Sequence, residues 1–236
     1  MFSATTPEEW NVLYISKSAR KVPGYRAVAE KEVQIGGPVI DWQAEGAVSK
    51  VIAQGQCLAM YAFAAVGAAE GLAAIYFRAP AQLSTQQVLD CSATYGNRGC
   101  DNGTVPAAFD FIVGRGLMTA NDYPYNGGPM PCRFQSGTFR GVKSYSNIVG
   151  CNDLALALAK QPVAVAIDGT YIMYYQGGLF GQCDFDPNYP MLLTGMTDTY
   201  WRLKGPIGTV WGEMGYIRIV RGNSCGVCMA GILPSP

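Results

Sequence analysis

The segment Gln54–Val66 constrains the fold more than any other part of the chain. A glutamine, a glycine and Cys57 form a short stretch that precedes an alanine-rich apolar run ending at Glu70-Gly71. The run is apolar on every side, which predicts a buried helix that begins shortly after the cysteine. A loop that leads into a helix N-terminus presents backbone N–H groups, so it favours negative charge and can hold a reactive thiolate.

The chain contains no histidine, and this absence restricts its chemistry. Mechanisms that need an imidazole base are excluded, and so are zinc sites built on histidine. Cys225-Gly226-Val227-Cys228 is the only Cys-x-x-Cys pair, and no second pair completes a metal site. We therefore expect neither a metal nor a cofactor.

The composition is apolar and poor in charge. Hydrophobic residues make up 49% of the 236 residues and charged residues 14%, against about 25% charged in an average domain. The net charge is zero and no basic cluster is present, so we expect no nucleic-acid partner. No apolar run reaches the roughly 20 residues of a membrane span. A surface short of charge favours association, so we expect protein partners or a place in a large assembly.

Five further motifs occur in a definite order along the chain, one before the cysteine segment and four after it. They are Gly36–Trp42, Leu83–Cys91, Gly99–Gly103, Asp122–Tyr125 and Trp211–Ile219. Together with Cys57 and Tyr61, they resemble the papain-like cysteine proteases over about residues 38–236. The resemblance implies an α+β fold of two lobes with a cleft between them. A helical left lobe would span about residues 48–140, and an antiparallel β-barrel right lobe about 141–236, with crossing ends.

The first 37 residues resemble part of an inhibitory prosegment. Phe2–Trp10 has the signature of a helix start, with Thr6 as N-cap, Pro7 at the first helical position and Glu9 three residues after the cap. A generic capped helix is the alternative. We interpret residues 1–37 as a prosegment remnant and linker.

The resemblance carries the family's catalytic positions onto four residues. The nucleophile falls at Met60, the base at Tyr189 and the orienting asparagine at Gly205, while Gln54 keeps the oxyanion-type glutamine. A thioether has no proton to lose, and a phenol with a pKa of about 10 is a poor base near neutrality. The alternative is structural: Met60 fills the core, Tyr189 belongs to the barrel and Gln54 holds a loop.

These positions lead to the prediction that the chain is not an enzyme. It would be a catalytically inactive papain-like protein that serves as a binding or structural component. The alternative is a hydrolase with other chemistry in the same cleft, using Asp101 or Asp186 with Tyr189. Cleft-binding residues would be Asn102, Gly103 and Tyr61. Asn102-Gly103-Thr104 is also an N-glycosylation sequon, and we expect the cleft to be narrower and more apolar than in a working protease.

The family resemblance also implies a disulfide pattern. It pairs Cys57 with Cys100, Cys91 with Cys132 and Cys183 with Cys228, and it leaves over Cys151 and Cys225, which would pair with each other or remain free. Three such disulfides indicate a secretory, extracellular or endolysosomal protein. If Met1 is the true initiator, the protein would be intracellular.

Overall fold

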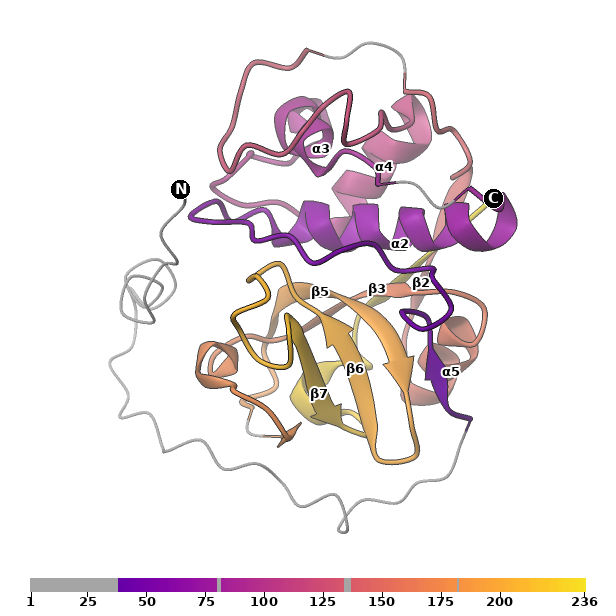
Figure 1. The fold of residues 1–236 in the computed structure, drawn as a ribbon, viewed down its shortest axis with the longest axis vertical. Coiled ribbons are helices and arrows are strands. Elements are labelled where there is room, and N and C mark those ends of the chain that lie inside the picture. The colour runs from indigo at the N-terminus through magenta and orange to yellow at the C-terminus, as the bar shows by residue number, and fades with distance from the viewer. Residues whose placement is uncertain (1–37, 80–81, 134–136, 182) are drawn as a thin grey trace.

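The computed structural model describes residues 38–79, 82–133, 137–181 and 183–236. The described chain forms a layer of helices packed against a layer of strands, with helices at the top of Figure 1 and strands below. The predicted α+β class is confirmed. The predictions for residues 1–37, including the helix start at Thr6, lie outside the described residues.

Helix α2 (Met60–Tyr76) lies between two shorter helices and the sheet (Figure 1). Most of its side chains are buried, because it is covered on both sides, and its alanines allow close packing. The predicted end at Glu70-Gly71 is wrong, since the helix continues to Tyr76. The glycine serves packing instead: a Cβ on Gly71 would lie 2.7 Å from the ring of Pro162. Gly67 likewise brings the helix against Leu192.

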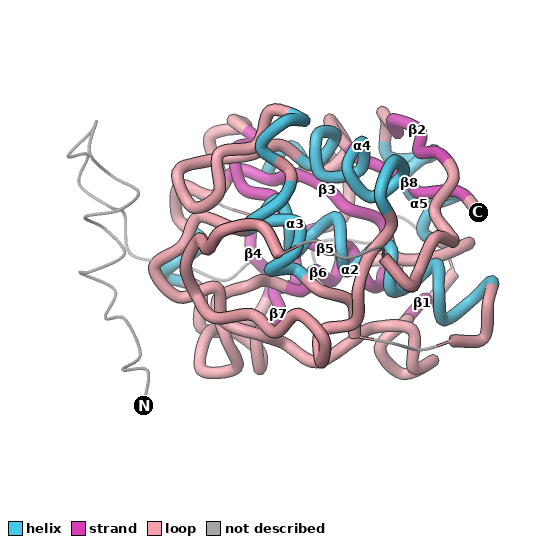
Figure 2. The backbone as a smooth tube through the Cα atoms, turned by 90° about the horizontal axis from the view of Figure 1, so that it is seen from above, coloured by secondary structure: helices cyan, strands magenta, loops and turns pink. Residues whose placement is uncertain are grey.

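Two shorter helices complete the helical layer. Helix α3 (Thr85–Cys91) begins at the N-cap Ser84, whose side chain accepts a hydrogen bond from the Gln87 backbone N–H at 2.9 Å. Helix α4 (Val105–Arg115) begins at the N-cap Thr104, which accepts from Ala107. The Leu83–Cys91 motif of the sequence therefore contains a capped helix, and Cys91 is its last residue. Figure 2, viewed from the helical side, shows these helices lying over the strands.

The second layer is one largely antiparallel sheet with the strand order β2-β8-β3-β5-β6-β7-β4. Strand β1 pairs with β5 off this path, and among the described strands only the short β4–β7 pair is parallel. The strand bounds are Ile40–Asp41 (β1), Ser144–Ile148 (β2), Val163–Asp168 (β3), Leu179–Phe180 (β4), Pro187–Met196 (β5), Tyr200–Lys204 (β6), Tyr216–Val220 (β7) and Gly231–Ser235 (β8). Helix α5 (Cys151–Leu158) connects β2 to β3, and short 3-10 turns lie at Ala93–Tyr95, Ile172–Tyr174 and Ser224–Gly226. The apolar runs Val163–Ile167 and Met191–Leu193 of the sequence lie in β3 and β5.

Each layer has its own hydrophobic core. The helical core includes Leu72, Phe109 and Ile112, whereas the sheet core includes Trp201 and Leu203. Burying such side chains contributes about 1.5–3 kcal/mol each relative to exposure. The two cores meet along α2, because that helix contributes residues to both.

A polar cluster joins the layers midway along α2. The buried carboxylate of Glu70 accepts hydrogen bonds from Ser49 Oγ at 2.5 Å and from the Leu83 backbone N–H at 2.8 Å. Lys204 Nζ donates to Ser49 O and Oγ, at 2.8 and 3.0 Å. Burial raises the pKa of Glu70 and lowers the pKa of Lys204. This cluster, Glu70 with Ser49, Leu83 and Lys204, is called the Glu70 cluster below.

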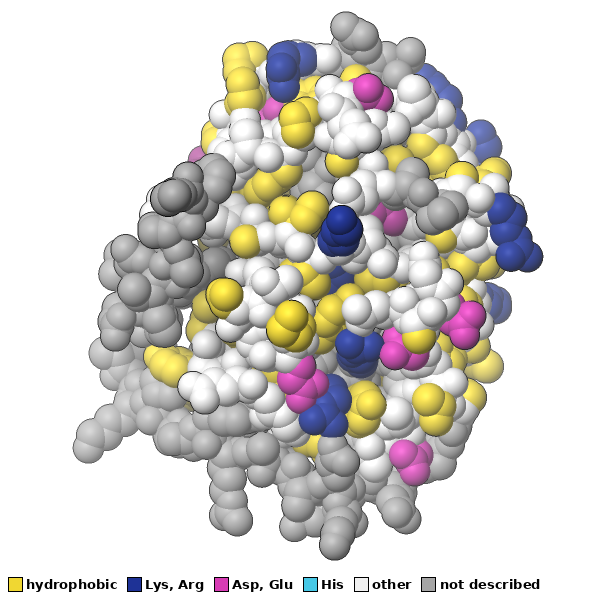
Figure 3. Space-filling model, viewed as in Figure 1, with side chains coloured by type: hydrophobic (Ala, Val, Ile, Leu, Met, Phe, Trp, Pro, Cys, Tyr) yellow, Lys and Arg dark blue, Asp and Glu magenta, His cyan; other side chains and the backbone are white. Residues whose placement is uncertain are grey.

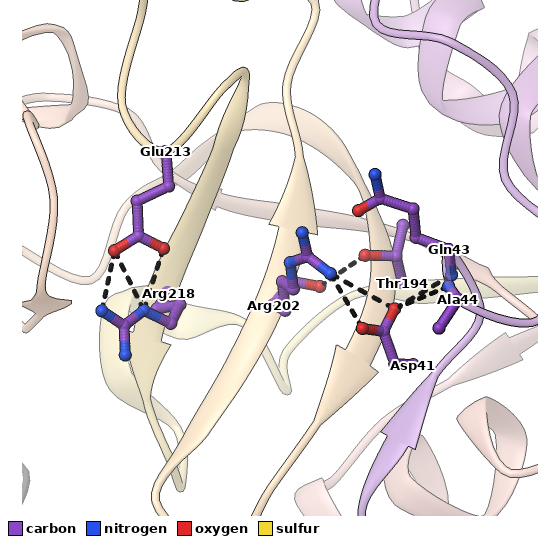
Figure 4. Close-up of polar contacts among 7 residues, drawn as sticks. All are labelled: Asp41, Gln43, Ala44, Thr194, Arg202, Glu213 and Arg218. Atoms are coloured by element: carbon purple, nitrogen blue, oxygen red, sulfur yellow. Dashed lines mark hydrogen bonds and ion pairs between the residues drawn. The ribbon is translucent and has the colours of Figure 1, made fainter.

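Two ion pairs stabilise the sheet at its surface (Figure 4). Arg202 Nη1 lies 3.1 Å from Asp41 Oδ2 and joins β6 to β1, and Arg218 Nη2 lies 2.7 Å from Glu213 Oε1 beside β7. Elsewhere, charged side chains on the face drawn in Figure 3 are scattered among apolar and neutral ones. The small share of charged residues in the sequence therefore appears on this face as single, separated charges.

All eight cysteines form disulfides, so no thiol is free. The predicted pairs Cys57–Cys100 and Cys91–Cys132 are confirmed. The predicted pair Cys183–Cys228 is wrong, because Cys183 bonds to Cys225 and Cys228 bonds to Cys151. The reason is local: Cys225 and Cys228 flank one turn, and each faces a different neighbouring segment.

Candidate functional site

A pocket of about 660 Å³ lies where the N-terminal end of α2 meets the sheet. Its helical wall comes from the start of α2 and from the loop before α4, and its other wall comes from β2, β3, β8 and the start of β5. The lining is mostly apolar with a few amides and one carboxylate, which is typical of a ligand pocket. Residues that line it include Met60, Asp101, Asn102, Gly103, Thr104, Val149, Ala164, Ala166, Met229 and Ala230.

Met60 is the first residue of α2 and borders the pocket. Its N-cap position, Ala59, provides no side-chain cap. The Met60 side chain is only 6% exposed and packs in the sheet core. Met60 therefore borders the pocket, as predicted for a cleft residue, and it also fills the core, as the alternative proposed.

The loop before α4 is fixed by the ring of Tyr61. A Cβ on Gly103 would lie 2.6 Å from that ring, so only glycine allows this approach. Tyr61 Oη donates to the Gly99 carbonyl at 3.1 Å, and the Thr104 backbone N–H donates to Asn97 Oδ1 at 2.8 Å. Burial raises the pKa of Tyr61. Tyr61 thus supports the loop from below, while Asn102 and Gly103 line the pocket.

Gln54 lies in the interior rather than on the pocket wall. Its side chain is fully buried, and neither amide atom has a hydrogen-bond partner among the described residues. Its backbone is held firmly, since its N–H donates to Pro206 O at 2.7 Å and its carbonyl accepts from Tyr125 Oη at 2.8 Å. A buried amide without partners costs free energy, so loop hydrogen bonding by this side chain is not what the structure shows.

The two remaining catalytic positions are also away from the pocket surface. Tyr189 is 1% exposed in β5, opposite Ile167 of β3. Gly205 follows β6 and lines a separate cavity of about 30 Å³ beside the Glu70 cluster. The structure therefore brings Met60, Asn102 and Gly103 together, and it places Gln54, Tyr61, Tyr189 and Gly205 outside that lining.

The carboxylates of the alternative chemistry are not brought together. Asp101 lines the pocket, but Asp186 does not, and Tyr189 is buried in the sheet. No group of three or more histidine, cysteine or acidic side chains within the described ranges could hold a metal ion. Among the described helices, none is both long and apolar enough to cross a membrane.

The sheet wall of the pocket was missed by the sequence reasoning. It includes Val149, Ala164, Ala166 and Met229, from β3 and the segments beside β2 and β8. The signal that could have found it is the alternation Val163-Ala164-Val165-Ala166, in which small residues leave room on one face of a strand. Val149 and Met229 carry no such signal.

Comparisons with known proteins agree on one family. Residues 37–235 match the family described as papain family cysteine protease. Cathepsin L 2 of Paramecium tetraurelia is 32% identical over 99% of this chain and 75% of its own length. A cysteine protease of Carica candamarcensis, solved in complex with E-64, superposes with a TM-score of 0.78 at 31% identity, over 84% of this chain and 97% of that one. Digestive procathepsin L 3 of Tenebrio molitor superposes with a TM-score of 0.82 at 34% identity, over 98% of this chain and 79% of that one.

These comparisons confirm the papain-like fold and correct two predictions. The chain was predicted not to be an enzyme, and to act as an inactive binding or structural component, with a hydrolase of other chemistry as the alternative. The prediction that the chain is not an enzyme and the predicted function are both wrong, because the proteins that match are named cathepsins and cysteine proteases. Nothing in the fold or the comparisons shows a structural role.

Proposed function

The chain belongs to the papain family of cysteine proteases, and from this we propose that it acts on polypeptides held in the pocket beside Met60. The single observation that carries the proposal is the pocket itself, which is about 660 Å³ and lies where the helical layer meets the sheet. That volume falls in the range of sites that bury most of a ligand.

The shape of the lining supports an extended chain with an apolar side chain in the pocket. Ala164 and Ala166 provide a low floor on β3, and Val149 and Met229 provide an apolar wall. Asn102 and Gly103 provide polar groups along the opposite wall. An extended peptide needs this combination, because its backbone requires hydrogen bonds and its side chains require pockets.

The test is binding and cleavage of fluorescent peptides by the full chain. Ala230→Trp adds a bulky ring at an exposed position of the pocket, so it should weaken peptide binding without disturbing either core. Ala79→Trp is the matched control, since Ala79 is exposed beyond the far end of α2. We expect binding by the unaltered chain and the control, and loss in Ala230→Trp. Absence of binding, or equal binding by all three, would refute the proposal.

Cleavage is recorded in the same samples, because proteolysis is the activity that the relatives' names carry. Every cysteine of this chain is in a disulfide and the sequence has no histidine. If the chain cleaves a peptide, the products show which peptide bond lies beside Met60. A thiol-directed inhibitor then shows whether a thiol takes part in the cleavage. Peptide binding is read separately and does not depend on this outcome.

We further propose that residues 1–37 correspond to the end of a prosegment. The support is that the alignment with a procathepsin covers 98% of this chain, more than the family match to residues 37–235. Mass analysis of the N-terminus of the protein from its own cells tests this. A mature N-terminus near Pro38 would show that the segment is removed, and an intact segment would show that it is kept.

Four disulfides in a papain-family chain indicate a secretory or lysosomal protein. The finer assignment, extracellular or endolysosomal, is part of the proposal. Immunolocalisation with a lysosomal marker separates the two sites.

A further inference from the structure

We propose that Asn102 carries an N-linked glycan that covers the rim of the pocket. Asn102-Gly103-Thr104 is the one Asn-x-Ser/Thr sequence with a residue other than proline in the middle among the 236 residues. The structure places this sequence on the pocket, since Asn102, Gly103 and Thr104 all line it. The modification would thus sit at the position where a ligand enters.

The side chain of Asn102 is available for the modification. Asn102 and Thr104 are both exposed. Oδ1 of Asn102 accepts a hydrogen bond from the Gly103 backbone N–H at 2.7 Å, whereas Nδ2 has no partner among the described residues. Because Gly103 packs on the ring of Tyr61, the loop is anchored from below. The glycan therefore finds an accessible amide on a well-held loop.

The reaction balances with one co-reactant, a lipid-linked oligosaccharide diphosphate. The bond between the first sugar's anomeric carbon and the diphosphate oxygen breaks, and a bond from that carbon to Asn102 Nδ2 forms. The amide nitrogen loses a proton, and the lipid diphosphate leaves. This transfer takes place in the secretory pathway, which is also where the four disulfides would form.

A glycan at this place would cover apolar surface. Val149 is 66% exposed and Met229 is 46% exposed, and both line the same pocket as Asn102. A chain with only 14% charged residues has few charges to keep such a rim in solution. Because a glycan is bulky and solubilising, it would shield these side chains and restrict the pocket to slender ligands such as an extended peptide.

The first experiment is glycopeptide mapping of the full chain secreted from a eukaryotic host. We expect the Asn102 peptide to carry a glycan, and enzymatic removal to convert Asn102 to aspartate. Asn102→Gln should abolish the modification, and Thr104→Ser should retain both the sequon and the helix cap. Asn152→Gln, at an exposed asparagine of α5 outside any sequon, is the control and should stay glycosylated at Asn102. An unmodified Asn102 in the secreted chain would overturn the proposal.

The second experiment tests the shielding with an apolar dye, anilinonaphthalenesulfonate, and so does not depend on peptide binding. Dye fluorescence should rise in Asn102→Gln relative to the glycosylated chain. Adding Val149→Asp to Asn102→Gln should reduce it, whereas adding Val210→Asp, at a residue 85% exposed and outside the pocket lining, should not. Equal dye fluorescence with and without the glycan would overturn the shielding. Failure of peptide binding with this dye response intact would count against the proposed function alone.

Discussion

The helical layer meets the sheet in two different ways along α2. Midway along the helix, the Glu70 cluster closes the contact: its polar groups pair with one another, and the adjoining cavity is only about 30 Å³. At the N-terminal end, Met60 borders a pocket of about 660 Å³. The two layers are therefore in close contact midway along α2, and they diverge at its N-terminal end and leave space for a ligand.

The largest effect should come from breaking the closed contact. Glu70→Ala removes the acceptor for Ser49 and Leu83 and leaves the partly buried Lys204 without its counter-charge. We expect the free energy of unfolding to fall by about 3 kcal/mol. Denaturant titration measures it, and Glu45→Ala, at an exposed glutamate, should change it by less than about 0.5 kcal/mol.

A double variant identifies the cause of that loss. If the unpaired charge of Lys204 is responsible, replacing both Glu70 and Lys204 by methionine should cost less than Glu70→Ala alone, because an apolar pair leaves no buried charge. A double variant that is less stable than Glu70→Ala would contradict this account of the cluster.

The next effect concerns the close approach of α2 to the sheet layer. Gly71→Ala places a Cβ 2.7 Å from the rigid ring of Pro162. Overpacking costs about 1–3 kcal/mol, and the gain in helix propensity offsets up to about 1 kcal/mol, so we expect a net loss of about 1–2 kcal/mol. Gly128→Ala is the control, since nothing lies within 4 Å of its added Cβ. Thermal unfolding measures the stability of both variants. Equal stability of Gly71→Ala and Gly128→Ala would contradict the prediction.

Much of the fold could be predicted from the sequence, because motif order and helix caps are local signals. The end of α2 could not, since a charged residue followed by glycine is typical of a helix end. Here Gly71 is required by Pro162, and Glu70 by Lys204. Both partners lie far along the chain, so no local pattern reveals them.

The candidate site was predicted only in part for the same reason. Met60, Asn102 and Gly103 were named because they belong to motifs, and they line the pocket. The disulfide of Cys228 was assigned wrongly from the family resemblance, because Cys225 lies only three residues away and no local pattern distinguishes the two. Val149 and Met229 were missed because each reaches the pocket through the packing of distant strands.

The stability of the closed contact midway along α2 should depend on pH, because this contact contains the buried carboxyl group of Glu70. Burial raises the pKa of Glu70 above its ordinary value of 4.5, so the folded chain holds this proton more tightly than the unfolded chain. Stability is then greatest below pH 4.5 with respect to this group, and it decreases as the pH rises through the raised pKa. Chemical unfolding at several pH values measures it, and Glu70→Gln should remove this component. An unchanged pH profile in Glu70→Gln would contradict it.

The smallest effect is expected at the open end of α2. Met60 contacts the sheet core on one side and the pocket on the other, so a leucine of similar volume can shift toward the open space. We expect Met60→Leu to lower the free energy of unfolding by less than about 1 kcal/mol. Met191→Leu is the matched control, because Met191 is 1% exposed within the sheet core and a branched side chain has less room to adjust there. Denaturant titration compares the two. If Met60→Leu cost as much as Met191→Leu, the N-terminal end of α2 would be as tightly packed as the rest of the core, and the contrast between the two contacts would not hold.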